Sequence, residues 1–108
     1  MPYIRFKGFP DSFVEDITPA VVEDFASIVP IEREKVKIEL LNVRIVTNTP
    51  LSVEIMMFQR VQETHDAVAA SINRILEERG YSGVHIFFII LDPHLYYKEG
   101  KPLKTREA

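Results

Sequence analysis

The amino-terminal residue Pro2 is the first position in this chain that could do chemistry. If Met1 is removed, Pro2 carries a free secondary amine, and an exposed α-amino group titrates near pH ~7.7–8.0. Partial burial or a nearby cation lowers such a pKa, so the neutral amine could act as a general base. If Met1 is retained, the Pro2 nitrogen is an amide without basicity. The alternative is a proline without a chemical role, since proline makes up roughly 5% of any sequence.

A second set of candidate residues consists of charged side chains at alternate positions of predicted strands. Its members are Arg5, Lys7, Lys37, Glu39, Glu54 and His85. Side chains of opposite sign on neighbouring strands can pair across a sheet, so one interpretation is an ion-pair network. The other is a polar pocket near the start of the first strand, where cations would hold a small acidic molecule close to Pro2.

Composition and length exclude several classes of function. The chain has 108 residues, a net charge of -3 and no cysteine, which indicates one domain and a cytoplasmic location. It has no basic patch for nucleic acid, and its most apolar run is too short to span a membrane. No metal-ligand cluster, phosphate-binding glycine loop or catalytic serine pattern is present, so we expect neither metal nor cofactor. We expect a single domain over residues 1–100 and a polar, loose tail over 101–108.

Hydrophobic periodicity predicts the elements that must position these residues. Apolar alternation predicts strands at the following positions: 3–7, 36 to as far as 46, 51–58 and 83–91. Helical spacing predicts helices over about 12–29 and 62–79. Pro19 either kinks the first helix or begins a shorter helix capped by Thr18. We expect the longer helix, because its apolar stripe keeps its phase across Pro19.

The order of these elements is β-α-β followed by β-α-β, which predicts a two-layer α/β fold. Each unit should place its two strands parallel, so that both helices lie on one face of a four-stranded sheet. Residues 84–91 are apolar on both faces, which is typical of a strand that is buried on both sides. We therefore expect another copy of the chain to cover the face that the helices leave open.

Smaller candidates have structural interpretations. His65 lies on the apolar stripe of the second helix, where we expect a packed histidine at the edge of the core. Asp92 and His94 flank Pro93, and a turn is favoured over a site. Tyr96 and Tyr97 either pack on the end of the sheet or close the pocket of a neighbouring subunit.

Several motifs resemble the tautomerase superfamily, which includes macrophage migration inhibitory factor (MIF) and 4-oxalocrotonate tautomerase. The resemblance is closest to an uncharacterised bacterial branch, a domain of unknown function. Besides Pro2 at the start of a strand, the motifs are Glu39-Leu40-Leu41-Asn42, Val53-Glu54-Ile55, Phe58-Gln59-Arg60, and Tyr96-Tyr97 with Gly100.

The resemblance implies a (β-α-β)2 tautomerase/MIF-like fold with a mixed sheet, assembled as a homotrimer. It implies that Pro2 is the base in an enol–keto isomerisation of a small acid, with Lys37 on the substrate carboxylate. His85 and Phe87 take the places of a tyrosine and an asparagine that reach the neighbouring subunit's proline in the cytokine branch. Tyr97 would close the pocket.

Two basic residues of the superfamily are missing from their expected places. An arginine after the first strand would fall near Ser12, and a lysine before the second strand would fall near Ile31. Two other functions therefore stay open: a non-catalytic oligomer on the same scaffold, and a ferredoxin-like binding module with the same element order. The ferredoxin-like module differs in the pairing of its strands.

Overall fold

Four strands form one mixed sheet in the order β2-β1-β3-β4 in the computed structural model, which describes residues 2–104. The strands are β1 (Tyr3–Lys7), β2 (Lys37–Leu41), β3 (Ser52–Phe58) and β4 (His85–Leu91). β1 pairs with β2 and β3 pairs with β4 in parallel, and the antiparallel pair β1–β3 joins the two halves. The ferredoxin-like alternative is wrong, because its βαβ units are split whereas here both strands of each unit are neighbours.

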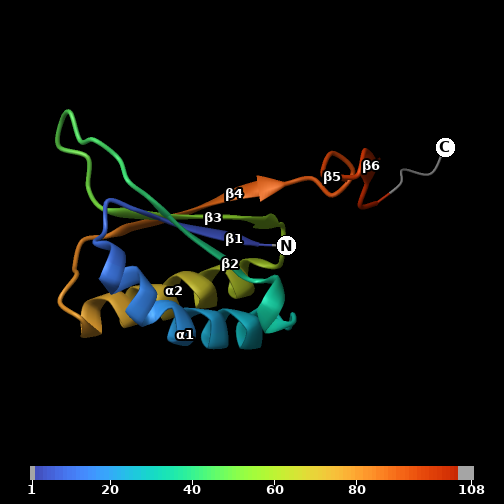
Figure 1. Ribbon diagram of the computed structural model, residues 1–108. Helices are drawn as coiled ribbons and strands as arrows, with labels where there is room; N and C mark the ends of the chain where they lie inside the picture. Colours follow the sequence, from blue (N-terminus) through green and yellow to red (C-terminus); the bar gives the residue numbers. More distant parts are fainter. Residues whose placement is uncertain (1, 105–108) are drawn as a thin grey trace.

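Both helices cover the same face of the sheet, as Figure 1 shows. α1 spans Asp11–Ile28 and α2 spans Gln62–Glu78. α1 continues through Pro19, which confirms the longer of the two expected helices. A single turn of 3-10 helix, η1 (Arg33–Lys35), then leads into β2.

The hydrophobic core lies between the helices and the sheet. Ile4, Phe6 and Ile55 point to the helical side, where Ile17 and Leu76 meet them, and all five are fully buried. Each buried side chain of this size contributes about 1.5–3 kcal/mol to the free energy of folding. The core thus fixes the strand register, which in turn decides which residues lie on the opposite, helix-free face.

β2 is shorter than the sequence predicted. It ends at Leu41, and residues 42–51 form a connection that extends away from the sheet (Figure 1). Val46 in this connection is 84% exposed, so its apolar alternation has no sheet to join. Position 8, at the end of β1, requires a glycine. Its φ is +86°, and a Cβ there would lie only 2.9 Å from Leu51 Cδ2 at the end of this connection.

The carboxyl-terminal segment extends beyond the end of the sheet. A two-stranded hairpin of β5 (Tyr97–Lys98) and β6 (Lys101–Pro102) projects from the body of the molecule in Figure 1. Glu99 and Gly100 have positive φ values, as its two-residue turn requires. β6 begins where we expected the tail, and the rest of that tail, residues 105–108, lies outside the described residues.

Within residues 2–104 no helix is long and apolar enough to cross a membrane. The same residues contain no group of three or more His, Asp or Glu side chains placed to hold a metal ion.

Candidate functional site

A cavity of about 200 Å³ opens beside Pro2, where the start of β1, the end of α1 and the end of β3 come together. Its lining residues are Pro2, Val29, Ile31, Lys35, Met57, Phe58 and Arg60. Apolar side chains make most of the wall, and the two charged residues are both cations. This composition suits a small molecule with an apolar body and an anionic group.

Hydrogen bonds of the main chain place both Pro2 and Lys35 at this cavity. The N–H of Lys37 donates to the carbonyl oxygen of Pro2 at 3.0 Å, which continues the parallel ladder of β1 and β2 by one residue. Just before it, the N–H of Val36 donates to the carbonyl of Arg33 at 3.0 Å and closes η1. The same short connection therefore sets the position of the proline and of the lysine.

Arg60 comes from the other half of the chain. It lies in the short link between β3 and α2, and its backbone N–H donates a 3.0 Å hydrogen bond to Nε2 of His65. His65 is 9% exposed, and its ring meets the edge of Phe88 with 4.5 Å between centroids. The expected position of His65, at the edge of the core, is confirmed.

The charges around Pro2 favour an anion and a neutral amine. Lys35 and Arg60 both line the cavity, so a carboxylate would meet two cations there. On a chain without Met1, cations at this cavity would disfavour a positive charge on the Pro2 amine. The arrangement could bind an acid and hold an uncharged base beside it.

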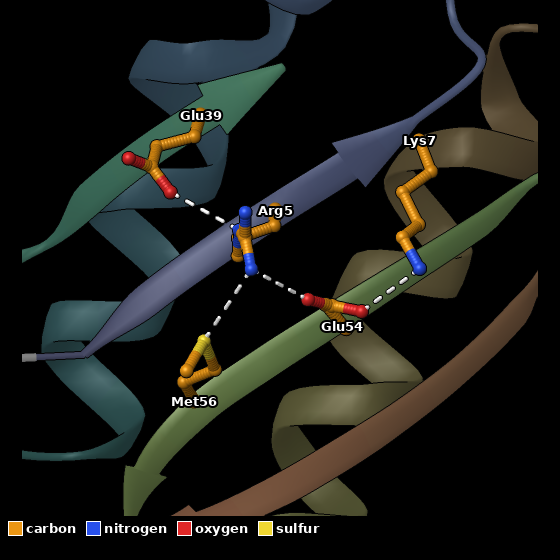
Figure 2. A network of polar contacts seen from close by, with 5 residues as sticks. All are labelled: Arg5, Lys7, Glu39, Glu54 and Met56. Carbon is orange, nitrogen blue, oxygen red and sulfur yellow. Dashed lines mark hydrogen bonds and ion pairs between the residues drawn. The ribbon is translucent and has the colours of Figure 1, made fainter. Parts of the chain in front are cut away.

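The helix-free face of the sheet carries an ion-pair network, shown in Figure 2. The Glu54 carboxylate, 6% exposed as a residue, lies 2.9 Å from Arg5 Nη1 and 3.0 Å from Lys7 Nζ. Arg5 also contacts Glu39, with 3.2 Å between Nε and Oε1, and Met56 Sδ at 3.8 Å. Arg5 and Lys7 are thus arranged as the ion-pair interpretation of this face expects.

The predicted binding residues Lys37, His85 and Phe87 also lie on the helix-free face, because they pair with Tyr3, Ser52 and Glu54 of that face. Lys37 Nζ is 5.2 Å from the ring centroid of Tyr3, and Phe87 is 42% exposed. His85 pairs with Ser52 of β3, whereas Tyr3, the neighbour of Pro2, pairs with Met56 of the same strand. Ser52 and Met56 are four positions apart, so His85 lies roughly 13 Å along the sheet from the Pro2 end.

Tyr97 lies in the projecting hairpin and is 58% exposed. Within the described part of one chain, the wall of the Pro2 cavity includes neither Tyr97 nor the three candidates of the helix-free face.

Tyr96 ties the carboxyl-terminal segment to the start of β1. Its hydroxyl is 2.8 Å from that of Tyr3, and its ring meets the edge of Phe58 at 5.8 Å. The hydrogen bond with Tyr3, together with desolvation, raises the pKa of Tyr96 to about 12. The Asp92–His94 turn also forms as expected, since the His94 N–H donates to Asp92 Oδ1 at 2.9 Å.

The sequence interpretation missed Lys35 and Arg60 as cavity residues. Lys35 falls between the predicted first helix and second strand, and Arg60 was named only as part of a family motif. One signal was present: the cytokine branch carries a lysine before its second strand, and that place was assigned to Ile31. Ile31 and Lys35 both line the cavity. The cavity therefore does contain a lysine, four residues after the position where the cytokine branch has one.

Comparisons with known proteins agree with this fold. A family model described as "Domain of unknown function (DUF1904)" matches residues 1–102. A search of curated proteins gave no match. A protein of unknown function from Vibrio cholerae O1 biovar eltor is similar at a TM-score of 0.85 and 27% identity, covering 94% of this chain and 86% of that one.

Two further solved structures share the fold at lower identity. A DUF1904 domain from Sebaldella termitidis has a TM-score of 0.86 and 22% identity, over 94% of this chain and 99% of that one. A fused 4-OT, described as a wild-type asymmetric trimer, has a TM-score of 0.78 and 12% identity, over 94% and 95%. The expected tautomerase-superfamily fold, with a mixed sheet and both helices on one face, is confirmed.

Proposed function

Because the chain belongs to the family described as a domain of unknown function (DUF1904), which has the tautomerase fold, we propose that it is a tautomerase-like isomerase. Its substrate would be a small enol or keto acid, with Pro2 as general base once Met1 is removed. The observation that carries this proposal is that Pro2, Lys35 and Arg60 line one cavity.

The proposed reaction moves one proton and needs no cofactor. Lys35 and Arg60 bind the carboxylate of an enol acid and bring its hydroxyl group to the Pro2 nitrogen. The neutral amine takes the hydroxyl proton, the electron pair moves to form the C=O bond, and the adjacent carbon takes the proton from the Pro2 ammonium. Amine and total charge are restored at the end of each turnover.

We propose that the functional form is a homotrimer. Phe87 and Ile89 on the helix-free face are 42% and 38% exposed in the single chain, and they form an apolar strip along β4. Sister chains covering this strip would remove it from water. The fused 4-OT of the same fold is described as a trimer, which supports this assembly.

The assembly gives the remaining predicted residues a role. Lys37, His85, Phe87 and Tyr97 would approach the Pro2 cavity of a neighbouring subunit, where each could contact the bound acid. These roles stay predictions, as does the cytoplasmic location that the lack of cysteine supports.

The experiment is a ketonisation assay with phenylenolpyruvate and 2-hydroxymuconate, on protein whose free Pro2 is confirmed by intact mass. We expect catalysis above buffer that falls at least tenfold in Pro2→Gly, which keeps an amine but loses the ring. A variant with Met1 retained is the second arm and should be inactive, because its Pro2 nitrogen is an amide. An equal rate in all three proteins would reject the base role, and no rate in any would favour a non-catalytic oligomer.

A further inference from the structure

His65 is one of three buried polar residues among the described part of the chain, together with Ser52 and Glu54. It lies in the first turn of α2 and points into the protein. Its ring contacts Phe88 on one side, and its Nε2 accepts the hydrogen bond from the Arg60 N–H at 3.0 Å. The ion pairs with Arg5 and Lys7 account for the buried Glu54. The proposed reaction, in contrast, gives His65 no role.

The hydrogen bond defines the state of the His65 ring. A nitrogen that accepts a bond from an N–H carries no proton, so the ring is neutral and its proton is on Nδ1. Nδ1 is buried, and no hydrogen-bond partner for it exists among the described residues. A buried donor without a partner costs free energy that a leucine at this position would avoid. The polar ring is therefore explained by what Nε2 does rather than by packing.

What Nε2 does is hold the main chain of Arg60. Arg60 lies between the last residue of β3, Phe58, and the first residue of α2, Gln62. The bond from His65 supplies a fixed anchor for this link at the residue that lines the Pro2 cavity. Without it, the backbone of Arg60 could rotate, and its guanidinium would spend less time against the cavity.

We infer that His65 is a positioning residue, whose neutral Nε2 fixes the main chain of Arg60 so that its side chain can bind the substrate carboxylate. The inference rests on the proposed function, in which Arg60 and Lys35 bind the substrate carboxylate. His65 does not touch the substrate. It acts only through Arg60, and this distinguishes it from a residue that merely stabilises the fold.

The test is a double-mutant cycle with His65→Leu and Arg60→Gln in the ketonisation assay. We expect His65→Leu to raise KM roughly tenfold with little change in kcat, because it weakens binding of the carboxylate. In the Arg60→Gln background, His65→Leu should cause no further rise in KM. His65→Gln is the matched control: its Oε1 can accept the Arg60 N–H, so it should restore most of the affinity.

The opposite results would overturn the inference. An unchanged KM in His65→Leu, or an equal effect of His65→Leu with and without Arg60, would contradict it while leaving Pro2 catalysis intact. Should His65→Leu not fold, ¹⁵N NMR of the wild-type ring decides: Nε2 must be unprotonated and correlate with the Arg60 amide. A proton on Nε2 would refute the proposed bond.

Failure of the proposed function is a separate result. If the wild type does not ketonise its substrates, calorimetry with phenylpyruvate replaces KM as the measure of acid binding. Roughly tenfold weaker binding in His65→Leu, rescued by His65→Gln, would support the inference without catalysis. A wild type that binds no phenylpyruvate would overturn both proposals.

Discussion

The backbone N–H of Lys37 lies 3.0 Å from the carbonyl oxygen of Pro2 and donates a hydrogen bond to it. This bond joins β2 to the residue just before β1, and it leaves Lys35, two positions earlier, in the wall of the Pro2 cavity. The side chain of Lys37 points to the other face, over the ring of Tyr3. Two lysines of one segment thus have different tasks, since one lines the cavity and the other fixes Pro2 by its main chain.

Removal of either cavity cation should weaken substrate binding. Lys35→Gln and Arg60→Gln each lose a hydrogen bond to a charged group, worth about 1.5–3 kcal/mol, so KM should rise roughly 10- to 100-fold. Steady-state kinetics with an enol acid measures this. Arg74→Gln, at the exposed surface of α2, is the control and should leave KM unchanged. A larger rise in KM in Lys37→Gln than in Lys35→Gln would support the sequence-based assignment of Lys37 to the substrate.

A charge on the helix-free face should separate the subunits. Ile89→Glu places a carboxylate in the middle of the apolar strip on β4, where an interface would have to bury it. Light scattering should show a trimer for the wild type and a monomer for Ile89→Glu. Ala67→Glu, on the exposed side of α2, is the control and should stay trimeric. A monomeric wild type at micromolar concentration would contradict the assembly.

Glu54 should contribute to stability more than its neighbour Glu39. Glu54→Gln removes the charge that lies between Arg5 and Lys7, and their side chains are about 30% exposed, so we expect a loss of about 1–3 kcal/mol. Glu39→Gln breaks a pair whose carboxylate is 48% exposed, and the loss should stay below about 1 kcal/mol. Urea denaturation measures both values. Equal losses would show that burial of Glu54 has no effect.

The hydrogen bond between the hydroxyl groups of Tyr3 and Tyr96 should be detectable in a titration to alkaline pH. The pKa of Tyr96 is raised to about 12, so the native state favours the neutral hydroxyl. The protonated Tyr96 therefore stabilises the folded state fully at pH values below the unfolded-state pKa near 10. This stabilisation is lost as the pH rises through the folded-state pKa of about 12. Tyr3→Phe should lower the pKa of Tyr96 toward 10, followed by tyrosinate absorbance at 295 nm. Tyr97→Phe, which removes the hydroxyl of an exposed tyrosine, should leave the high-pH step in place.

Sequence patterns were sufficient for the fold because periodicity and order determine it. The alternation of Ile4 and Phe6 and the helical stripe through Pro19 both reflect burial, and burial is what the structure shows. The end of β2 was missed because apolar alternation continues into residues 42–46 without a neighbouring strand to pair with.

The site was predicted only in part, because a cavity depends on which ends of separate elements meet. Pro2 was identified from its position and chemistry, and it does line a cavity. Arg60 lies 58 residues away and reaches the same cavity through a turn held by His65, a contact that no local pattern contains. Lys35 was not identified because it lies four residues after Ile31, the position expected for the superfamily's lysine. Both positions precede the second strand, so the apolar alternation of that strand does not distinguish them.

The most direct test of a basic amine in the cavity is a ¹⁵N NMR titration of Pro2 in protein with confirmed removal of Met1. Lys35 and Arg60 should lower the pKa of the amine below the ~7.7–8.0 of an exposed α-amino group, and Lys35→Gln should raise it again. A Pro2 amine that titrates at or above that range, unaffected by Lys35→Gln, would contradict the account.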